Sequence, residues 1–339
     1  MNKVYILMSG GVDSSVSAFL MLKEKINVTG VTLKLFDSEG SKKAISDAKE
    51  VCKVLNIEHL VLDLVSEFKN KVIDYFINEY CSGRTPNPCV VCNKNIKFGL
   101  ALEKLSAENV ATGHYSKVVN VNGRYSVEKT KNRKDQSYCF CMLNQSQLGK
   151  IITPVHEFSK DQVRKIAKEN GIPVWDKKDS QDICFINGSY RDFLLKSGIK
   201  NCQGNFIDES GNILGHHNGI FNYTVGQRRG LNISSDNRLY IKSIDPLSNN
   251  IVLSRRNAVK RILIENLNFM LFSRENIPDN LMVCVRYSSS LERAKIEFLE
   301  DKAILDFEYP IFNVCPGQFA VCYYDNLIAM SGIISEVLV

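Results

Sequence analysis

The first 115 residues alternate between short apolar segments and longer segments with a helical rhythm, and this alternation restricts the possible folds most strongly. Residues 4–8 (VYILM) read as a buried strand, and residues 12–25 place apolar side chains at helical spacing. The strand-like runs VTGVTLKL, HLVLDL and NVATGH then alternate with the helix-like AISDAKEVCKVL and FKNKVIDYFINEY. Such alternation predicts right-handed crossovers and an α/β domain with a parallel sheet covered on both faces.

After about residue 200 glycine and asparagine become frequent, and the apolar pattern shortens to strand-sized pieces such as RLYIKSI and NIVLS. From about residue 265, runs such as MVCVRYSS, KAILDFEYP and FAVCYYDN are typical of strands joined by short turns. The sequence therefore predicts three domains: residues 1–199, a small central domain at 200–264, and a β-barrel at 265–339.

The heptapeptide SGGVDSS (Ser9–Ser15) lies between the first predicted strand and the first predicted helix. In a parallel sheet this position is at the carboxyl ends of the strands, where ligands bind. Glycines allow backbone amides to turn inward, and the helix amino terminus adds a positive dipole, so we expect a phosphate site. The alternative is a tight turn in which Asp13 and Ser14 cap the helix.

Composition restricts the class of protein. With 44% hydrophobic and 24% charged residues the chain is an ordinary globular protein, and its amino-terminal apolar run is too short for a signal peptide, so we expect a cytoplasmic protein without membrane contact. Eleven cysteines in that setting favour reduced thiols, metal binding or redox chemistry over a disulfide framework. Five of them are expected to be buried packing residues: Cys52, Cys81, Cys202, Cys284 and Cys322.

Basic residues are concentrated in two places. Residues 224–261 hold eight basic and two acidic residues, which equals the net charge of +6 of the whole chain. The stretch EKTKNRKD (128–135) holds four more basic residues, Lys129, Lys131, Arg133 and Lys134. Clusters of this kind suit a phosphate backbone, although a solvated surface would have the same composition.

SGGVDSS resembles the signature of the ATP pyrophosphatase (PP-loop) superfamily, whose adenine nucleotide α-hydrolase-like domains cleave ATP between the α and β phosphates. The resemblance implies ATP and Mg²⁺ as cofactors and an adenylated intermediate. Six further strings look like the tRNA-specific 2-thiouridylase family and extend over essentially the whole chain: RTPNPCVVCNKNIKFG, ATGHYS, KDQSYCF, DSQDICFI, YTVGQRRGL and CPGQFAVCY.

This narrower resemblance implies an ATP-dependent sulfurtransferase that converts the wobble uridine of tRNA to 2-thiouridine. The C2 oxygen of uridine is a poor leaving group, but its adenylate leaves as AMP. Sulfur has to arrive as a persulfide or sulfide, because an ordinary thiol would stay attached to the base. By the resemblance, Cys184 carries the persulfide, and Cys92 frees the sulfur and ends in a disulfide with Cys184. An upstream persulfide donor protein, such as a cysteine desulfurase or a relay, and a reductant are then required partners.

The resemblance also implies binding residues. For ATP these are Ser9, Gly10, Gly11, Val12, Asp13, Ser14, Ser15, Leu33 and Gly113. For tRNA and the target base they are Asn87, Pro88, Cys89, His114, Lys134, Asp135, Gln136, Arg286, Tyr287 and Gln318. The adjacent Lys94 and Lys97 would favour a thiolate at Cys92.

The chain departs from the family pattern at Cys89, where the family commonly has aspartate, and this loss puts an acid or base role there in doubt. The extra thiol opens an alternative, in which Cys89, Cys92 and Cys184 hold a [4Fe–4S] cluster. Zinc fits less well, because the chain has no second CxxC pair and no ligand-spaced histidine pair.

Two other functions stay open at this point. Another adenylating ligase of the superfamily would not need Cys92 and would act on a small substrate. A binding module would keep affinity for ATP and RNA without turnover. The sequence leaves the oligomeric state undecided, with a monomer as the simplest assumption.

Overall fold

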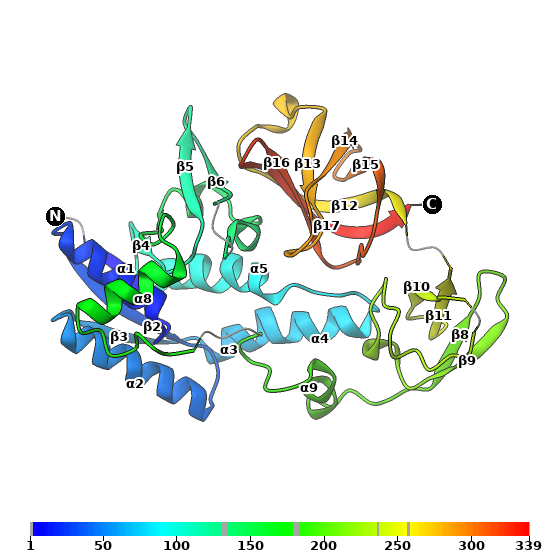
Figure 1. Ribbon diagram of the computed structural model, residues 1–339, viewed down its shortest axis with the longest axis horizontal. Coiled ribbons are helices and arrows are strands. Elements are labelled where there is room, and N and C mark those ends of the chain that lie inside the picture. The colour runs from blue at the N-terminus through cyan, green and yellow to red at the C-terminus, as the bar shows by residue number, and fades with distance from the viewer. Residues whose placement is uncertain (1–2, 131–133, 179–182, 236, 256–257, 339) are drawn as a thin grey trace.

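The computed structural model describes residues 3–130, 134–178, 183–235, 237–255 and 258–338, and its three parts are drawn in Figure 1. Within those residues no helix is long and apolar enough to cross a membrane. The parallel-sheet domain lies at one end, a small central domain lies at the other, and a β-barrel lies beside the middle of the molecule.

The first sheet has the strand order β3-β2-β1-β4-β7, and every pairing in it is parallel, as predicted. Its strands are β1 (Val4–Leu7), β2 (Val28–Lys34), β3 (His59–Asp63), β4 (Val110–Ala111) and β7 (Ile151–Ile152).

Helices cover both faces of this sheet because its strands are apolar on both sides. Val4 and Ile6 of β1 face a core shared with the first group of helices: α1 (Val12–Lys23), α2 (Glu39–Val54) and α8 (Lys160–Glu169). Leu7 belongs to the opposite core, which includes residues of α5 (Pro88–Cys92), the π-helix η2 (Asn93–Leu100) and α6 (Ala101–Lys104). The helical stretch before them consists of α3 (Val65–Phe68), the π-helix η1 (Lys69–Ile73) and α4 (Asp74–Cys81).

The remaining helices of the first domain are short. They are the 3₁₀-helix η3 (Ser137–Phe140), α7 (Gln145–Leu148) and α9 (Tyr190–Lys196). Near α9, Phe76 and Tyr80 of α4 pack with Phe221 and Leu194, which joins the first domain to the central domain. Figure 1 shows α4 running from the parallel-sheet domain toward that central domain.

The central domain is a four-stranded sheet of order β10-β11-β8-β9 around Phe206, Ile241 and Ile251. Its elements are β8 (Gly204–Ile207), β9 (Ile213–His217), the 3₁₀-helix η4 (Ile220–Asn222), β10 (Tyr240–Asp245) and β11 (Asn250–Ser254). The predicted strands RLYIKSI and NIVLS correspond to β10 and β11.

The carboxyl-terminal sheet is a six-stranded antiparallel barrel, closed by the pairing of β12 with β17. Its elements are β12 (Val259–Phe269), the 3₁₀-helix η5 (Arg274–Asn276), β13 (Asn280–Cys284), β14 (Glu292–Phe298), β15 (Ala303–Ile311), β16 (Phe319–Tyr324) and β17 (Leu327–Leu338). The hairpin of β5 (Lys117–Val121) and β6 (Arg124–Glu128), which belongs to the first domain, extends this sheet through the pair Leu327 and Glu128.

The predicted burial of cysteines is correct for Cys52, Cys284 and Cys322, but wrong for Cys81 and Cys202, which are exposed. Cys81 is the last residue of α4, and Cys202 precedes β8, so neither lies on the inner face of an element. The sequence pattern did not show that one of these cysteines ends a helix and the other precedes a strand.

Candidate active site

The loop between β1 and α1 folds tightly around two glycines and three serines. Gly10 has φ of +68°, and a Cβ there would lie 2.5 Å from the carbonyl oxygen of Ala44, so only glycine fits. The Ser14 hydroxyl accepts a hydrogen bond from the Ser9 N–H (3.2 Å) and donates to the Gly11 carbonyl (3.1 Å), to which Ser15 also donates (2.8 Å). The predicted residues Ser9–Ser15 therefore form one compact turn.

The amino terminus of α1 is suited to binding an anion. Its N-cap residue, Gly11, makes no side-chain capping bond, so the alternative in which Asp13 and Ser14 cap the helix is wrong. The first N–H groups of a helix have no partner within the helix and carry its positive dipole. These groups fit the phosphates of a nucleotide substrate such as ATP.

Gly113 packs directly on this turn. It follows β4, the neighbour of β1, and a Cβ at Gly113 would lie 2.6 Å from the Ser14 nitrogen and 2.7 Å from the Asp13 carbonyl carbon. The predicted ATP residue Leu33 lies near the end of β2, the other neighbour of β1. The carboxyl ends of three adjacent strands thus bring the predicted ATP residues to one edge of the sheet.

The Asp13 carboxylate is held by two side chains whose role the sequence did not indicate. Lys160 Nζ lies 2.7 Å from both carboxylate oxygens, and the Tyr115 hydroxyl donates to Asp13 Oδ1 at 2.6 Å. Lys160 is the first residue of α8, and its sequence separation from Asp13 is 147 residues. Tyr115 was visible within ATGHYS, but no sequence signal connected Lys160 to this loop.

The cysteine pair in NPCVVC lies on the short helix α5. The Asn87 side chain caps this helix by accepting from the N–H groups of Cys89 (3.2 Å) and Val90 (3.3 Å), and Pro88 occupies the first turn. Cys89 is exposed and Cys92 is buried. The cap and the proline fix the start of the helix and thereby the directions of both thiols.

The ammonium of Lys97, on η2, is close enough to four thiols to interact electrostatically with each of them: Cys89, Cys92, Cys139 and Cys184. Burial raises the pKa of Cys92 to about 12, and Lys97 acts in the opposite direction. Cys184 is an exposed residue, but the partial desolvation of its thiol raises its pKa, again against the effect of Lys97. Lys97 is therefore the counter-charge for any thiolate formed here.

Sequence reasoning missed Cys139, whose pKa burial raises to about 12, with a further increase from the neighbouring Cys89. It lies on η3, where the Asn93 side chain donates to its carbonyl oxygen at 2.9 Å. Cys139 is part of the KDQSYCF string (134–140), which drew attention to this segment but not to its thiol.

The alternative of a metal cluster at Cys89, Cys92 and Cys184 stays a prediction. Among the residues that the structure describes, no three Cys, His, Asp or Glu side chains are close enough to hold a metal ion. All the cysteines, Cys92 and Cys184 included, are free thiols, so the structure does not contain the disulfide that the resemblance implies at the end of each turnover. The first four residues of DSQDICFI lie outside the described residues.

His114 directly follows Gly113, which packs on the nucleotide loop, and its imidazole is close enough to Lys97 to be affected by that charge. Its Nδ1 is 2.6 Å from the Thr112 hydroxyl, and its ring packs edge-on against Phe140 at 5.1 Å. Burial and then the Lys97 charge hold the pKa of His114 well below its ordinary value, so the imidazole is neutral at pH 7. A neutral histidine here provides a hydrogen-bonding and packing group.

Two of the predicted tRNA residues come together between the first domain and the barrel. The Tyr287 hydroxyl donates to the Asp135 carbonyl oxygen at 2.8 Å, and the Asp135 carboxylate accepts from Ser137 at 2.7 Å. The Gln136 side chain accepts a hydrogen bond from the Tyr115 N–H at 2.9 Å, so the segment at Asp135 and Gln136 also supports Tyr115, which holds Asp13. Two further predicted tRNA residues are exposed: Lys134, which precedes Asp135, and Arg286, which precedes Tyr287.

Gln318 is buried. Its amide donates to the carbonyl oxygens of Thr85 (2.9 Å) and Pro86 (3.2 Å), directly before the Asn87 cap. The barrel therefore holds the loop that leads into the cysteine helix. A direct tRNA contact of Gln318 stays a prediction.

The basic clusters are only partly described. Arg228, Arg229, Arg238 and Arg255 are exposed on or beside the central domain. Lys242 is paired with Glu209 at 2.7 Å, which reduces the charge available to a ligand. Lys131, Arg133 and Arg256 lie outside the described residues.

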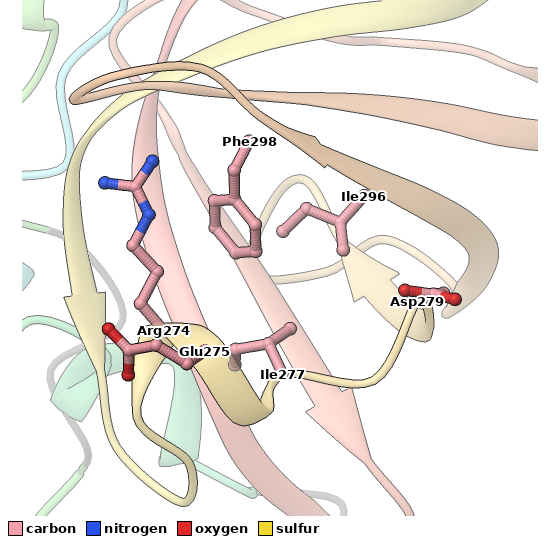
Figure 2. Close-up of a pocket in the computed structure, with 6 residues that line it drawn as sticks. All are labelled: Arg274, Glu275, Ile277, Asp279, Ile296 and Phe298. Atoms are coloured by element: carbon pink, nitrogen blue, oxygen red, sulfur yellow. The ribbon is translucent and has the colours of Figure 1, made fainter.

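A shallow pocket lies elsewhere, on the barrel (Figure 2). The Arg274 guanidinium lies over the Phe298 ring, 5.1 Å from its centroid, beside Ile277 and Ile296. Neither a cysteine nor any residue of the nucleotide loop lines it, so it is separate from the candidate active site.

Comparisons with protein families cover nearly the whole chain. Residues 2–188 match the family described as tRNA methyl transferase HUP domain, residues 191–255 the tRNA methyl transferase PRC-barrel domain, and residues 259–334 the aminomethyltransferase beta-barrel domain. These matches agree with a parallel-sheet domain, a central domain and a carboxyl-terminal barrel.

Curated relatives share this full length. The tRNA-specific 2-thiouridylase MnmA 1 of Clostridium tetani is 41% identical over 353 residues, which cover 99% of this chain and 97% of the relative. The enzyme MnmA 2 of Clostridium botulinum (strain Langeland) is 40% identical over 348 residues, with 99% of both chains covered.

A solved structure of the U34-tRNA thiolase NcsA from Methanococcus maripaludis with its [4Fe-4S] cluster is 19% identical, with a TM-score of 0.36. It covers 58% of this chain and 64% of that chain. A likeness this weak supports no conclusion about metal binding here. The identity to the two clostridial enzymes, over their full length, shows that the chain belongs to the tRNA-specific 2-thiouridylase family.

Proposed function

We propose that this protein uses ATP to convert the wobble uridine of tRNA to 2-thiouridine, with release of AMP and pyrophosphate. Family membership supports 2-thiolation of tRNA. The observation that carries the chemical part is the set of thiols around Lys97, next to the histidine that borders the nucleotide loop. Thiolation requires an oxygen activated by the nucleotide and a sulfur nucleophile. The loop Ser9–Ser15 is suited to the first requirement, and the thiols near Lys97 are suited to the second.

In the first step the uridine C2 oxygen attacks the α phosphate, and the bond to pyrophosphate breaks. The amides at the start of α1 bind the phosphates, and glycine at position 113 allows the segment after β4 to pack against this loop at Ser14. Magnesium would bind together with ATP, coordinated by its phosphates, and would neutralise their charge. Asp13, already paired with Lys160, contributes by holding the loop in shape.

In the second step the terminal sulfur of a Cys184 persulfide attacks C2, and AMP leaves. Cys92 then attacks the Cys184 sulfur, which breaks the sulfur–sulfur bond, releases 2-thiouridine and leaves a Cys92–Cys184 disulfide. The two thiols are oxidised by two electrons, and the transferred sulfur is reduced by two. An external reductant restores the thiols, and a persulfide donor protein reloads Cys184.

The three domains divide these tasks. Residues 1–199 carry the chemistry, residues 200–264 contact tRNA through their exposed arginines, and residues 265–339 support the cysteine helix. Asn87, Pro88 and Cys89 hold the target base, with Tyr287 as an aromatic platform for an unstacked nucleotide.

The test is AMP release and thiouridine formation from unmodified tRNA, Mg-ATP and a persulfide donor. Wild-type protein should release AMP only when tRNA is present, and Asp13→Ala should lose that release. Cys92→Ala should form adenylate but no 2-thiouridine. AMP release triggered by a small molecule instead of tRNA, with Cys92→Ala fully active, would identify another adenylating ligase.

A further inference from the structure

The Lys177 side chain reaches the nucleotide loop from a distant part of the sequence. Its Nζ donates to the Gly10 carbonyl oxygen at 2.8 Å and to Asp47 Oδ2 of α2 at 2.5 Å. The sequence separation from Gly10 is 167 residues. Neither the loop motif nor the cysteine motifs include Lys177.

The bond to Gly10 determines where the next amide points. The Gly10–Gly11 peptide is trans, and in a planar trans peptide the C=O and the following N–H point in opposite directions. With the Gly10 oxygen turned toward Lys177, the Gly11 N–H is turned away from it. The Gly11 oxygen is in turn held by Ser14 and Ser15, so two successive peptides are fixed by side chains.

Lys177 is itself firmly held. Asp47 pairs with its ammonium, and Arg164 of α8 donates to the carbonyl oxygens of Trp175 and Lys177, each at 2.8 Å. The ion pair limits the rotamers of a side chain that is otherwise flexible, and the two Arg164 bonds hold the backbone from which it extends. A fixed donor can orient a peptide in the absence of nucleotide, so no reorganisation is needed when the nucleotide binds.

We propose that Lys177 is a positioning residue for ATP, which acts through the Gly10–Gly11 peptide to direct the Gly11 N–H toward the nucleotide phosphates. The inference deepens the proposed function and rests on ATP as the substrate of this loop. Lys177 need not touch the nucleotide, because Asp47 already neutralises its charge.

The test compares Lys177→Met with Lys178→Met. Lys178 is the exposed neighbour, and the bond to the Gly10 carbonyl oxygen comes from Lys177. The dissociation constant of Mg-ATP is measured by calorimetry without tRNA, together with the dissociation constant of tRNA and the thermal midpoint. Lys177→Met should weaken Mg-ATP binding about tenfold, the scale of one charged hydrogen bond, and should leave tRNA affinity unchanged. Lys177→Arg should recover part of the loss, and Lys178→Met should match the wild type.

Asp47→Asn separates positioning from direct phosphate contact. If Lys177 works through the peptide, loss of its anchor should also weaken Mg-ATP binding. Tighter binding in Asp47→Asn would mean that the released ammonium contacts the phosphates, and would overturn the proposal, as would an unchanged dissociation constant in a folded Lys177→Met protein. A wild-type protein that binds Mg-ATP but forms no thiouridine would contradict the proposed function and leave this inference standing.

Discussion

At the scale of single residues, the chemistry of the candidate site depends on one ammonium and several thiols that are poorly ionised. Burial raises the pKa of Cys92 to about 12, so only a very small fraction is thiolate near neutral pH, and Lys97 is the positive charge that opposes this effect. The sequence suggested both Lys94 and Lys97 as neighbours, but Lys94 is exposed, whereas Lys97 faces the thiols. Sequence proximity could not decide between them, because the direction of a side chain depends on the π-helical turn of η2.

The pH dependence of sulfur release tests this electrostatic arrangement. Below the pKa of Cys92, each pH unit increases its thiolate about tenfold, so the single-turnover rate of 2-thiouridine release should rise by about that factor per unit between pH 6.5 and 8.5. Lys97→Met removes the stabilising charge, raises the pKa further and should slow release at every pH in this range. Lys94→Met is the matched control. A flat profile in wild-type protein would show that Cys92 ionisation does not limit the step.

At the scale of elements, the parallel sheet and the turn at Ser9–Ser15 were predictable because local patterns specify them: an apolar strand, two glycines and a segment with apolar residues at helical spacing. The hairpin of β5 and β6 was not predicted. It extends the barrel sheet through β17, about two hundred residues later, and strand pairing at that distance leaves little mark in the local sequence. The ion pair of Asp13 with Lys160 escaped prediction for the same reason.

Substitution of Asn87 separates its capping role from a contact with the base. Asn87→Ala removes the acceptor for two N–H groups of α5 and should lower the free energy of unfolding by about 1 kcal/mol. Asn87→Ser keeps a capping oxygen but loses the amide. If Asn87 also binds the target base, Asn87→Ser should keep the stability measured by denaturant unfolding and lose thiolation. Full activity in Asn87→Ser would restrict the residue to capping.

Substitution of Gly113 tests the contact between β4 and the nucleotide loop. In Gly113→Ala the new methyl group would meet the Ser14 nitrogen at 2.6 Å, so α1 has to move and its amides lose their alignment. We expect Mg-ATP binding to weaken by about tenfold or more, as measured by calorimetry. Gly123→Ala is the control, because an added methyl group there meets no other atom within 4 Å. The positive φ of Gly123 makes this substitution strained, so the control also shows whether a loss of stability alone weakens Mg-ATP binding. Unchanged binding in Gly113→Ala would mean that the loop adjusts freely.

At the scale of the whole molecule, the barrel supports the cysteine helix, although the two are far apart in the sequence. Gln318 donates to Thr85 and Pro86, the Thr85 N–H donates to the Pro316 carbonyl oxygen at 2.8 Å, and Tyr287 reaches Asp135. Sequence patterns predicted a barrel, but not its contact with this loop, because such contacts depend on how the domains are placed. Resemblance to the family selected Gln318 and Tyr287; the structure adds their contacts within the protein.

Removal of the Gln318 amide should therefore affect sulfur transfer more than nucleotide binding. Gln318→Ala leaves two carbonyl oxygens without this donor and should loosen the entry to α5, so we expect a several-fold slower single-turnover thiolation with an unchanged dissociation constant for Mg-ATP. Gln203→Ala, at an exposed glutamine of the central domain, is the control. Equal losses in ATP binding and thiolation would indicate a general loss of folding instead.

The most direct measurement of the proposed chemistry is a single turnover of iron-free protein whose Cys184 has been loaded with ³⁵S persulfide, mixed with Mg-ATP and unmodified tRNA. We predict one labelled 2-thiouridine for each persulfide, together with an equal amount of Cys92–Cys184 disulfide detected by peptide mass spectrometry. Cys184→Ser should transfer no label. Thiouridine that forms only when the protein contains iron and labile sulfide, or that forms at the wild-type rate in Cys184→Ser, would contradict the persulfide mechanism.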